Sequence, residues 1–256
     1  MPVNYVGLEQ ARQADGLRMV VVGGTPSPWG EAAKGILKIK GLDWLAVRLD
    51  QRDDAMVAWT GCRNAPVLML NDEAPRSDWQ EILLLAERLS PEPALLPAED
   101  PHRTEVLTLC EEICGVNGLG WFRRLDAVHR GLQGLEGFPP PVAGYLGKKY
   151  GYDASNAGQY VPEIVRLLNK LSKRLQEQQQ QGSRFYYGEQ LSAVDIYAAC
   201  FMALFRPLAE EVCPMPAPIR SAFSALDERI LAALDERLLE HRDFIYQDYL
   251  ELPLSL

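Results

Sequence analysis

One stretch, residues 17–49, constrains the fold of this chain more strongly than any other. It opens with an apolar run at 17–22, which predicts a buried strand because two glycines follow it directly. Apolar residues then recur at helical spacing over 28–40, and a second apolar run lies at 45–49. The connections between these segments are short. The stretch therefore predicts a strand–loop–helix–strand unit, as found in α/β domains.

The ends of the predicted helix carry the residue types that start and stop helices. Ser27 is a favourable N-cap, and Pro28 suits the first helical position because it has no N–H to lose and a preset φ. Gly41 suits the left-handed residue that follows a helix. Within the helix, the spacing places Lys34 and Lys38 on the solvent side. The helix thus begins, at its positive end, with a hydroxyl-bearing residue.

Two roles are open for Ser27. Unpaired N–H groups and the helix dipole attract anions to a helix N-terminus, so a thiolate beside Ser27 would gain from that field and from a hydroxyl hydrogen bond. The alternative is that Ser27 only caps its helix, since serine is among the preferred caps. The two roles are compatible, because the oxygen can accept from the helix while its hydrogen is donated elsewhere.

The α/β pattern continues to about residue 90. A strand at 64–70 is entered through Pro66, which is tolerated there because the first residue of a strand need not donate to the ladder. A helix follows from Ser77 or Asp78, and a glutamine three residues after the serine gives the spacing of a capping box. We expect one α/β domain over 17–90.

A proline-rich linker at 91–102 separates this domain from the remainder of the chain. Beyond the linker the pattern is helical, which predicts an all-α domain over 103–256. Its most apolar helix is expected at 191–208, where Ser192 and Asp195 stand in capping-box spacing. We therefore interpret Asp195 as a structural residue and not as a catalytic carboxylate.

Composition narrows the class of protein. Hydrophobic residues make up 47% and charged residues 24% of the chain, as is usual for globular proteins. The net charge of −9, without a Lys/Arg cluster, argues against a nucleic-acid partner. No apolar run is long enough to span a bilayer, and the first sixteen residues lack the apolar core of a signal peptide. Five irregularly spaced cysteines favour a reducing compartment, so we expect a cytoplasmic protein that does not bind membranes.

Cys110 and Cys114 lie one helical turn apart and suggest a metal or redox pair. No third and fourth ligand accompany them, since His102 and His129 lie outside any metal-binding spacing. Free cysteines are mostly small buried hydrophobes. We therefore predict no metal.

Four motifs, in the right order, make the chain similar to the cytosolic glutathione S-transferase superfamily. Ser27-Pro-Trp-Gly-Glu resembles the nucleophile-activating loop and first helix of that family, and Ala65-Pro66 resembles the residue and cis-proline that hold the cysteinyl backbone of glutathione. Residues 95–98 are similar to the interdomain linker, and residues 188–196 carry the helical-domain motif. The resemblance implies a thioredoxin-like α/β N-terminal domain followed by an all-α C-terminal domain.

The resemblance also implies an enzyme that binds glutathione as co-substrate and activates its thiolate for attack on a small apolar electrophile. Ser27 would donate a hydrogen bond to the thiolate, with Thr25 as its backup, and glutathione would contact Trp29, Ala65 and Pro66. The loop is closest in spacing to omega-like members, whose cysteine falls on Ser27. Serine at this position argues against the glutathione-dependent reductase chemistry of that class.

The start of the third helix departs from the family pattern. Many relatives carry Glu-Ser there and use the pair to hold the γ-glutamyl end of glutathione, whereas this chain reads Arg76-Ser77-Asp78. Counting back from the linker places Ser77-Asp78 on the pair, and matching the serine places Arg76-Ser77 on it. Ser77 would bind a carboxylate and Asp78 an ammonium group. Alternatively, Ser77 only caps the helix.

The family builds its hydrophobic-substrate site from the first helix of the second domain and from the C-terminal tail. This implies Trp121, Phe122 and Tyr249 as substrate contacts, although such aromatic residues are more often part of the core. The resemblance further implies a homodimer, which is also the commonest symmetric assembly. The competing hypothesis is a non-catalytic binding or assembly protein on the same fold, since fold does not determine function.

Overall fold

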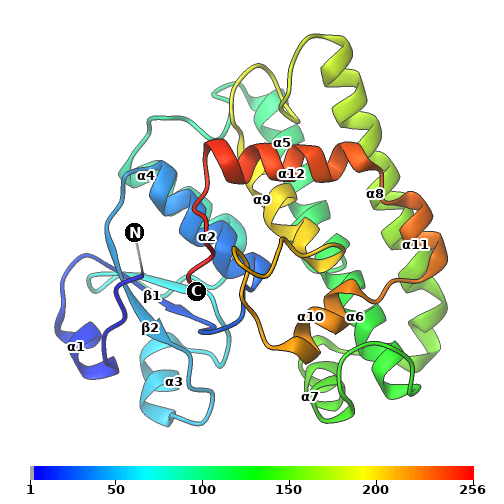
Figure 1. Ribbon diagram of the computed structural model, residues 1–256. Coiled ribbons are helices and arrows are strands. Elements are labelled where there is room, and N and C mark those ends of the chain that lie inside the picture. The colour runs from blue at the N-terminus through cyan, green and yellow to red at the C-terminus, as the bar shows by residue number, and fades with distance from the viewer. Residues whose placement is uncertain (1–2) are drawn as a thin grey trace.

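The computed structural model describes residues 3–256. Its first part combines a small sheet with helices and lies on the left in Figure 1. The elements of this α/β part are α1 (Leu8–Gln13), β1 (Leu17–Val21), α2 (Pro28–Ile39), β2 (Trp44–Arg48), α3 (Asp54–Thr60), β3 (Val67–Leu70) and α4 (Trp79–Leu89). The strand–loop–helix–strand unit predicted from the sequence is thus confirmed.

The sheet has three strands in the order β2-β1-β3. The central strand β1 is buried along its whole length, and this includes Arg18, the one charged residue in its otherwise apolar run. It pairs in parallel with β2 and antiparallel with β3, with Leu17 opposite Trp44 on one side and Leu70 on the other. Beyond β3 the pairing shrinks to a single antiparallel bridge between Leu68 and Arg76.

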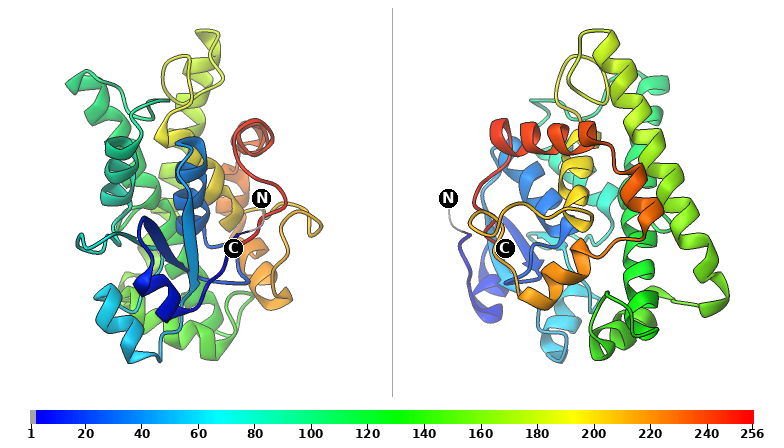
Figure 2. Two further views of the ribbon diagram at one scale, coloured as in Figure 1. Left: turned by 90° about the vertical axis from the view of Figure 1, so that its left-hand side faces the viewer. Right: turned by 45° about the vertical axis from the view of Figure 1, so that its right-hand side comes forward.

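The second part of the chain is entirely helical. Its elements are α5 (Asp100–Cys114), α6 (Leu119–Leu132), α7 (Pro140–Tyr150), η1 (Ala154–Asn156), α8 (Ala157–Gln180), α9 (Ala193–Phe201), η2 (Met202–Leu204), α10 (Ala217–Ser224), α11 (Glu228–Ala233) and α12 (Glu236–Asp248). Helix α9 occupies the centre and packs against α2, α5 and α12 (Figures 1 and 2). The apolar helix expected over 191–208 is shorter than predicted, because it tightens into a 3₁₀ turn at Met202.

Helix α2 begins and ends as its sequence predicts, with Ser27 at the N-cap and Gly41 at a φ of 64°. The expectation that Lys34 faces solvent is wrong. Lys34 is buried and pairs with Glu31 at 2.8 Å, and burial raises the pKa of the Glu31 carboxyl against the opposing effect of Lys34. The reason is that residues 250–256 run back over α2 (Figure 1).

The capping box predicted in α9 is formed. The carboxylate of Asp195, which is completely buried, accepts hydrogen bonds from the backbone N–H of Ser192 at 2.8 Å and from its hydroxyl at 2.6 Å. It also accepts from the N–H of Tyr186 at 2.8 Å and contacts Nε2 of His241 at 2.9 Å. Asp195 therefore joins α9 to α12 as well as starting its own helix.

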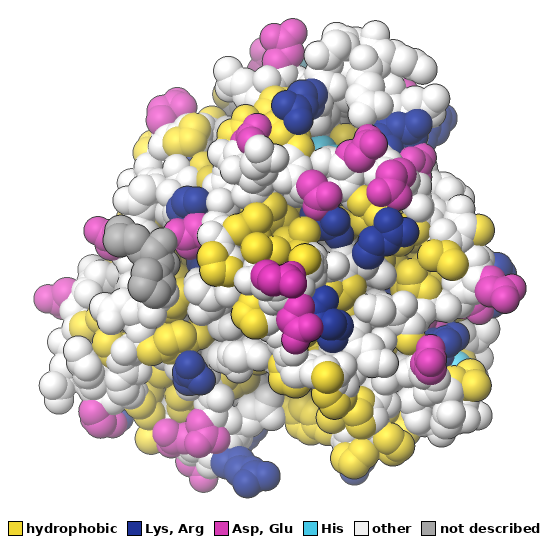
Figure 3. Space-filling model, viewed as in Figure 1, with side chains coloured by type: hydrophobic (Ala, Val, Ile, Leu, Met, Phe, Trp, Pro, Cys, Tyr) yellow, Lys and Arg dark blue, Asp and Glu magenta, His cyan; other side chains and the backbone are white. Residues whose placement is uncertain are grey.

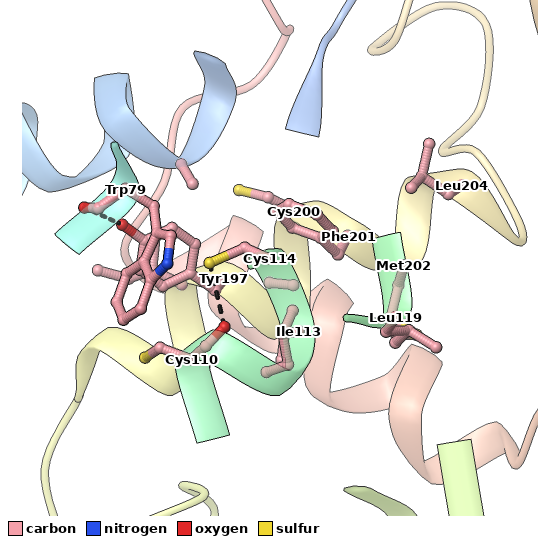
Figure 4. Packing of buried hydrophobic residues seen from close by; sticks show 14 of the residues in the cluster. Trp79, Cys110, Ile113, Cys114, Leu119, Tyr197, Cys200, Phe201, Met202 and Leu204 are labelled. Atoms are coloured by element: carbon pink, nitrogen blue, oxygen red, sulfur yellow. Dashed lines mark hydrogen bonds between the residues drawn. The ribbon is translucent and has the colours of Figure 1, made fainter. Parts of the chain in front are cut away.

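Cys110, Cys114 and Cys200 belong to the core around α9 (Figure 4), Cys213 lies in the same large cluster, and the partly buried Cys62 packs against a smaller one. Cys114 donates its thiol hydrogen to the carbonyl oxygen of Cys110 at 3.1 Å, and burial raises the pKa of both thiols well above the usual value. All five cysteines are free. Residues 3–256 contain no cluster of His, Cys, Asp and Glu suited to a metal ion, and no helix in that range is long and apolar enough to cross a membrane.

Candidate active site

A cavity of about 360 Å³ lies between the α/β part and the helical part. Loops of the α/β part and the first turn of α2 form one wall, and α6, α7 and α10 form most of the other. The first wall carries most of the residues that the sequence singled out: Thr25, Ser27, Trp29, Ala65, Pro66 and Ser77, together with Val22, Gln51 and Asn64.

The sheet topology explains why these loops meet. Strands β1 and β2 are parallel, so the loops that leave their carboxyl ends lie at the same edge of the sheet. Strand β3 runs the other way and places Val67, its first residue, beside Val20 near the end of β1. The Ala65–Pro66 bond, which is cis, therefore lies at the edge where the loop to Ser27 begins.

Ser27 has the geometry of an N-cap without using its side chain as one. Its carbonyl accepts the N–H of Glu31 at 2.8 Å, and its own N–H donates to the carbonyl of Thr25 at 2.8 Å. The hydroxyl makes no cap hydrogen bond with the described part of the chain, and Ser27 lines the cavity. Of the two roles open to Ser27, the side-chain cap is not observed.

Ser77 and Asp78 have separate positions. Ser77 lines the cavity, whereas Asp78 is the N-cap of α4 and accepts from the N–H groups of Gln80 at 2.8 Å and Glu81 at 3.3 Å. The capping box expected from Ser77 is replaced by this cap. Arg76 turns to Glu73 as an ion pair.

Trp29, in the first turn of α2, joins the two parts of the molecule. Its Nε1–H donates to the carbonyl of Cys114 in α5 at 2.8 Å, and its ring meets Phe201 of α9 edge to face at 4.7 Å. The ring also lines the cavity. The wall near Ser27 is thus held by side-chain contacts that reach two helices of the helical part.

The helical wall contains only one of the three aromatic residues expected to contact a hydrophobic substrate. Trp121 lines the cavity and meets Tyr150 edge to face at 4.9 Å. Phe122 packs toward Tyr160 instead, and Tyr249 belongs to a separate aromatic cluster with Phe244. Apolar residues of other elements complete the wall: Phe138, Val142, Leu146, Ile219 and Phe223.

Several cavity residues were missed by the sequence analysis. Tyr145 of α7 donates its hydroxyl hydrogen to Oε1 of Gln51 and so joins α7 to the loop after β2. Arg124 and Lys149 also line the cavity. Arg124 had a usable signal, since it follows Trp121 by three residues on a predicted helix and so shares its face. The residues of α7 had none, because only the tertiary packing brings that helix to the cavity.

Solved structures with the same architecture cover nearly the whole chain. A glutathione S-transferase from Methylobacterium radiotolerans in complex with glutathione sulfonate is 20% identical, with a TM-score of 0.58 and 91% of both chains covered. A glutathione transferase family member from Pseudomonas fluorescens with two glutathione molecules bound is 17% identical, with a TM-score of 0.62 and 93% of this chain and 92% of that chain covered. A glutathione S-transferase from Methylobacillus flagellatus with glutathione bound is 16% identical, with a TM-score of 0.63 and 90% and 95% covered.

The chain has the glutathione transferase fold. The fold class predicted from the sequence, a thioredoxin-like α/β part followed by helices, is confirmed. No family model and no curated protein sequence matches the chain.

In this glutathione transferase fold, a buried arginine positions the α10 side of the cavity. The guanidinium of Arg123 donates to the carbonyl of Leu204 and to three carbonyls at the end of α10, those of Ala222, Phe223 and Ala225, at 2.8–3.2 Å. It also pairs with Asp126 at 3.2 Å. Desolvation lowers the pKa of Arg123 to about 10. Ile219 and Phe223 are thereby held against the cavity.

The surface around the helical wall of the glutathione transferase fold is apolar. Hydrophobic side chains gather in the lower part of the face shown in Figure 3, over the region of α7 and α10. Among the described residues that line the cavity, the charged ones are Arg124 and Lys149, and no carboxylate is present. The cavity therefore combines a polar wall at the end of α2 with an apolar wall that carries positive charge.

Proposed function

We propose that this protein is a glutathione transferase that activates the glutathione thiol for attack on a small electrophile with an apolar body. The observation that carries the proposal is the hydroxyl of Ser27. It stands at the positive end of α2, makes no cap hydrogen bond within the described residues, and shares a cavity with the cis Ala65–Pro66 bond. Helix N-termini favour anions, and a thiolate is one.

Glutathione would lie along the α/β wall. The backbone of Ala65 would pair with the cysteinyl backbone of the tripeptide, since the residue before Pro66 stands at an edge of the sheet. Ser77, just before the N-terminus of α4, would bind the γ-glutamyl carboxylate. Asp78 already caps α4 with its side chain, so we leave it out of the proposed ligand set. Trp29 would flank the ligand.

The chemical step needs modest electrostatic help and good positioning. A thiol with a pKa of about 8.5 is only a few per cent ionised at neutral pH. Lowering that pKa by about 2 units requires roughly 2.7 kcal/mol of preferential stabilisation of the thiolate and raises its population by at most about thirty-fold. The remaining rate must come from holding sulfur and electrophile together. Thr25 is the alternative hydroxyl for this role.

The electrophile would lie against Trp121 and the apolar residues of α7 and α10. Phe122 and Tyr249 are not among the residues that line the cavity, so we leave them out of this proposal. The sulfur–carbon bond forms as the leaving group departs with its electron pair, and the thiol hydrogen passes to solvent. We further propose that the protein works as a cytoplasmic homodimer, because its cysteines are free and the resemblance implies this assembly.

Two assays in series test the function. We expect retention of the protein on immobilised glutathione with elution by free glutathione, followed by conjugation of chlorodinitrobenzene above the uncatalysed rate. Retention without conjugation would favour the competing hypothesis of a non-catalytic binding protein. Failure of both would contradict glutathione as the ligand of this cavity. Reduction of mixed disulfides in place of conjugation would favour the hypothesis of a glutathione-dependent reductase, against which Ser27 argues.

A further inference from the structure

Two cations on the helical wall of the cavity have no counter-ion among the residues that the structure describes. Arg124 comes from α6 and Lys149 from α7, and both line the cavity. Within residues 3–256, no carboxylate forms an ion pair with either side chain, and none lines the cavity. The chain as a whole carries a net charge of −9, so uncompensated positive charge here does not follow from its composition.

Arg124 is held by aromatic rings instead of by an acid. Its guanidinium lies 4.7 Å from the centre of the Trp29 ring and 4.6 Å from that of Tyr150. One Nη donates to the hydroxyl of Tyr150, and the buried Nε has no partner among the described residues. Stacking fixes the plane of the guanidinium but leaves its charge uncompensated.

Lys149 lies near one of the rings that Arg124 contacts. Its Nζ lies 5.6 Å from the centre of the Tyr150 ring, which Arg124 also contacts, and 5.9 Å from that of Tyr145. Two like charges around one ring repel each other, and an anion between them would relieve that repulsion. Arginine is also suited to a planar carboxylate, which it can bind through two N–H groups.

We propose that the electrophile carries a carboxylate, which binds Arg124 and Lys149 while its apolar body lies against Trp121 and the neighbouring apolar residues. This inference rests on the proposed function, because it names the substrate class of the same cavity. Glutathione would occupy the opposite wall, where Ala65, Pro66 and Ser77 are located. The acid group orients the electrophile, and the reaction remains the exchange of a leaving group for sulfur.

Binding can be tested without turnover by using two matched ligands that have no leaving group. Dinitrobenzoate and dinitrobenzamide have nearly the same shape, but only the first is anionic at neutral pH. Titration calorimetry with the full-length protein should give an affinity for the acid at least about tenfold above that for the amide, as expected of a charge-assisted hydrogen bond. Equal affinities, or tighter binding of the amide, would overturn the inference.

Variants assign the preference to these two residues. Arg124→Gln and Lys149→Gln should each lower the acid-to-amide affinity ratio about tenfold or bring it near unity. Lys148→Gln is the matched control, because Lys148 is the exposed neighbour of Lys149 on α7 and does not line the cavity. Its ratio should equal that of the unchanged protein. A ratio that falls equally in all three variants would show a general effect of charge and would overturn the inference.

Conjugation of chlorodinitrobenzoate and chlorodinitrobenzamide gives a second readout. In this step sulfur bonds to the ring carbon, chloride leaves with the bonding pair, and the thiol proton enters solvent. The acid-to-amide ratio of kcat/KM, corrected for spontaneous rates, should follow the ratio of affinities. If Arg124→Gln and Lys149→Gln weaken glutathione binding without changing that ratio, the cations serve glutathione and the inference is wrong. If neither these compounds nor chlorodinitrobenzene is conjugated, the proposed function fails, and the calorimetric comparison still tests the inference.

Discussion

At the scale of single residues, Ser27 shows how a common capping position becomes available for chemistry. Serine at an N-cap usually accepts a hydrogen bond from the first turn through its side chain. Here the backbone of Ser27 starts α2, and its side chain makes no cap bond in the described structure. The hydroxyl hydrogen and oxygen both remain available to a ligand in the cavity. Function and stability are therefore separable at this position.

Ser27→Ala is expected to raise the pKa of bound glutathione thiol and slow conjugation, because the lost hydrogen bond favours only the thiolate. Affinity for the thiol form should change little. Stability should fall by less than the roughly 1 kcal/mol typical of a lost side-chain cap. Titration of thiolate absorbance in the bound complex measures the pKa. Coinciding titration curves for the two proteins would transfer the role to Thr25 or favour a non-catalytic protein.

Asp195→Ala should be among the most damaging substitutions outside the cavity. It removes a buried acceptor from Ser192, Tyr186 and His241 at once, and leaves their polar groups unpaired. We expect the free energy of unfolding to fall by about 3 kcal/mol or more. Asp53→Ala, which removes the half-buried side-chain cap of α3, should cost about 1 kcal/mol. Urea denaturation of both variants checks this, and equal losses would contradict a special role for Asp195.

At the scale of elements, α2 is covered on two sides. Its N-cap Ser27 and Trp29 of its first turn line the cavity, while its outer face is covered by residues 250–256. The Nζ of Lys38 donates to the carbonyl of Leu250 at 3.0 Å, and Lys34 reaches Ser255 at 3.4 Å. The helix that positions the proposed catalytic hydroxyl is thus also part of the core.

Two glycine-to-alanine substitutions measure how closely this covering segment packs. A Cβ at Gly35 in α2 would lie 2.6 Å from Cδ2 of Leu250, whereas a Cβ at Gly144 in α7 would meet nothing within 4 Å. Gly144→Ala should stabilise the protein by up to about 1 kcal/mol through helix propensity. Gly35→Ala should be less stable than Gly144→Ala by about 1–3 kcal/mol, because Leu250 must move. Similar thermal denaturation midpoints would show that residues 250–256 are loosely packed.

The elements that could be predicted from sequence are those with local signals. The apolar run of β1, the residues at both ends of α2 and the box that starts α9 each lie within a few adjacent residues. The burial of Lys34 and the convergence of Arg124 with Lys149 depend on segments far apart in the chain. Hydrophobic periodicity alone does not predict such contacts. Ser77 and Asp78 were ambiguous because both are good caps, and only the tertiary structure shows which of them caps α4.

At the scale of the whole molecule, the cavity lies at the interface between two parts that also contact each other elsewhere. Trp29 and the hydrogen bond between Tyr145 and Gln51 both cross from one part to the other. Helix α9, in the centre of the helical part, packs against α2. A change in the relative position of the two parts would therefore alter the cavity directly. We expect substitutions at this junction to affect the binding of both substrates.

We expect a homodimer in solution, as the resemblance implies and as is commonest for symmetric oligomers. Sedimentation velocity at micromolar concentration should show a species of twice the chain mass of 28.7 kDa. Dilution should shift the distribution toward that chain mass if the dimer dissociates reversibly. A single species of 28.7 kDa at every concentration would contradict the prediction.

The contact between α2 and residues 250–256 also bears on the order in which the chain matures during translation. These partners are separated by more than 200 residues, as the bonds from Lys34 and Lys38 show. Domains generally fold as they leave the ribosome, from the N-terminus onward. Helix α2 emerges before residues 250–256, so its Lys34–Glu31 pair, which is buried in the folded protein, is expected to stay exposed to water until that segment is added. We therefore expect nascent chains to bury this face of α2 only after residues 250–256 have been synthesised.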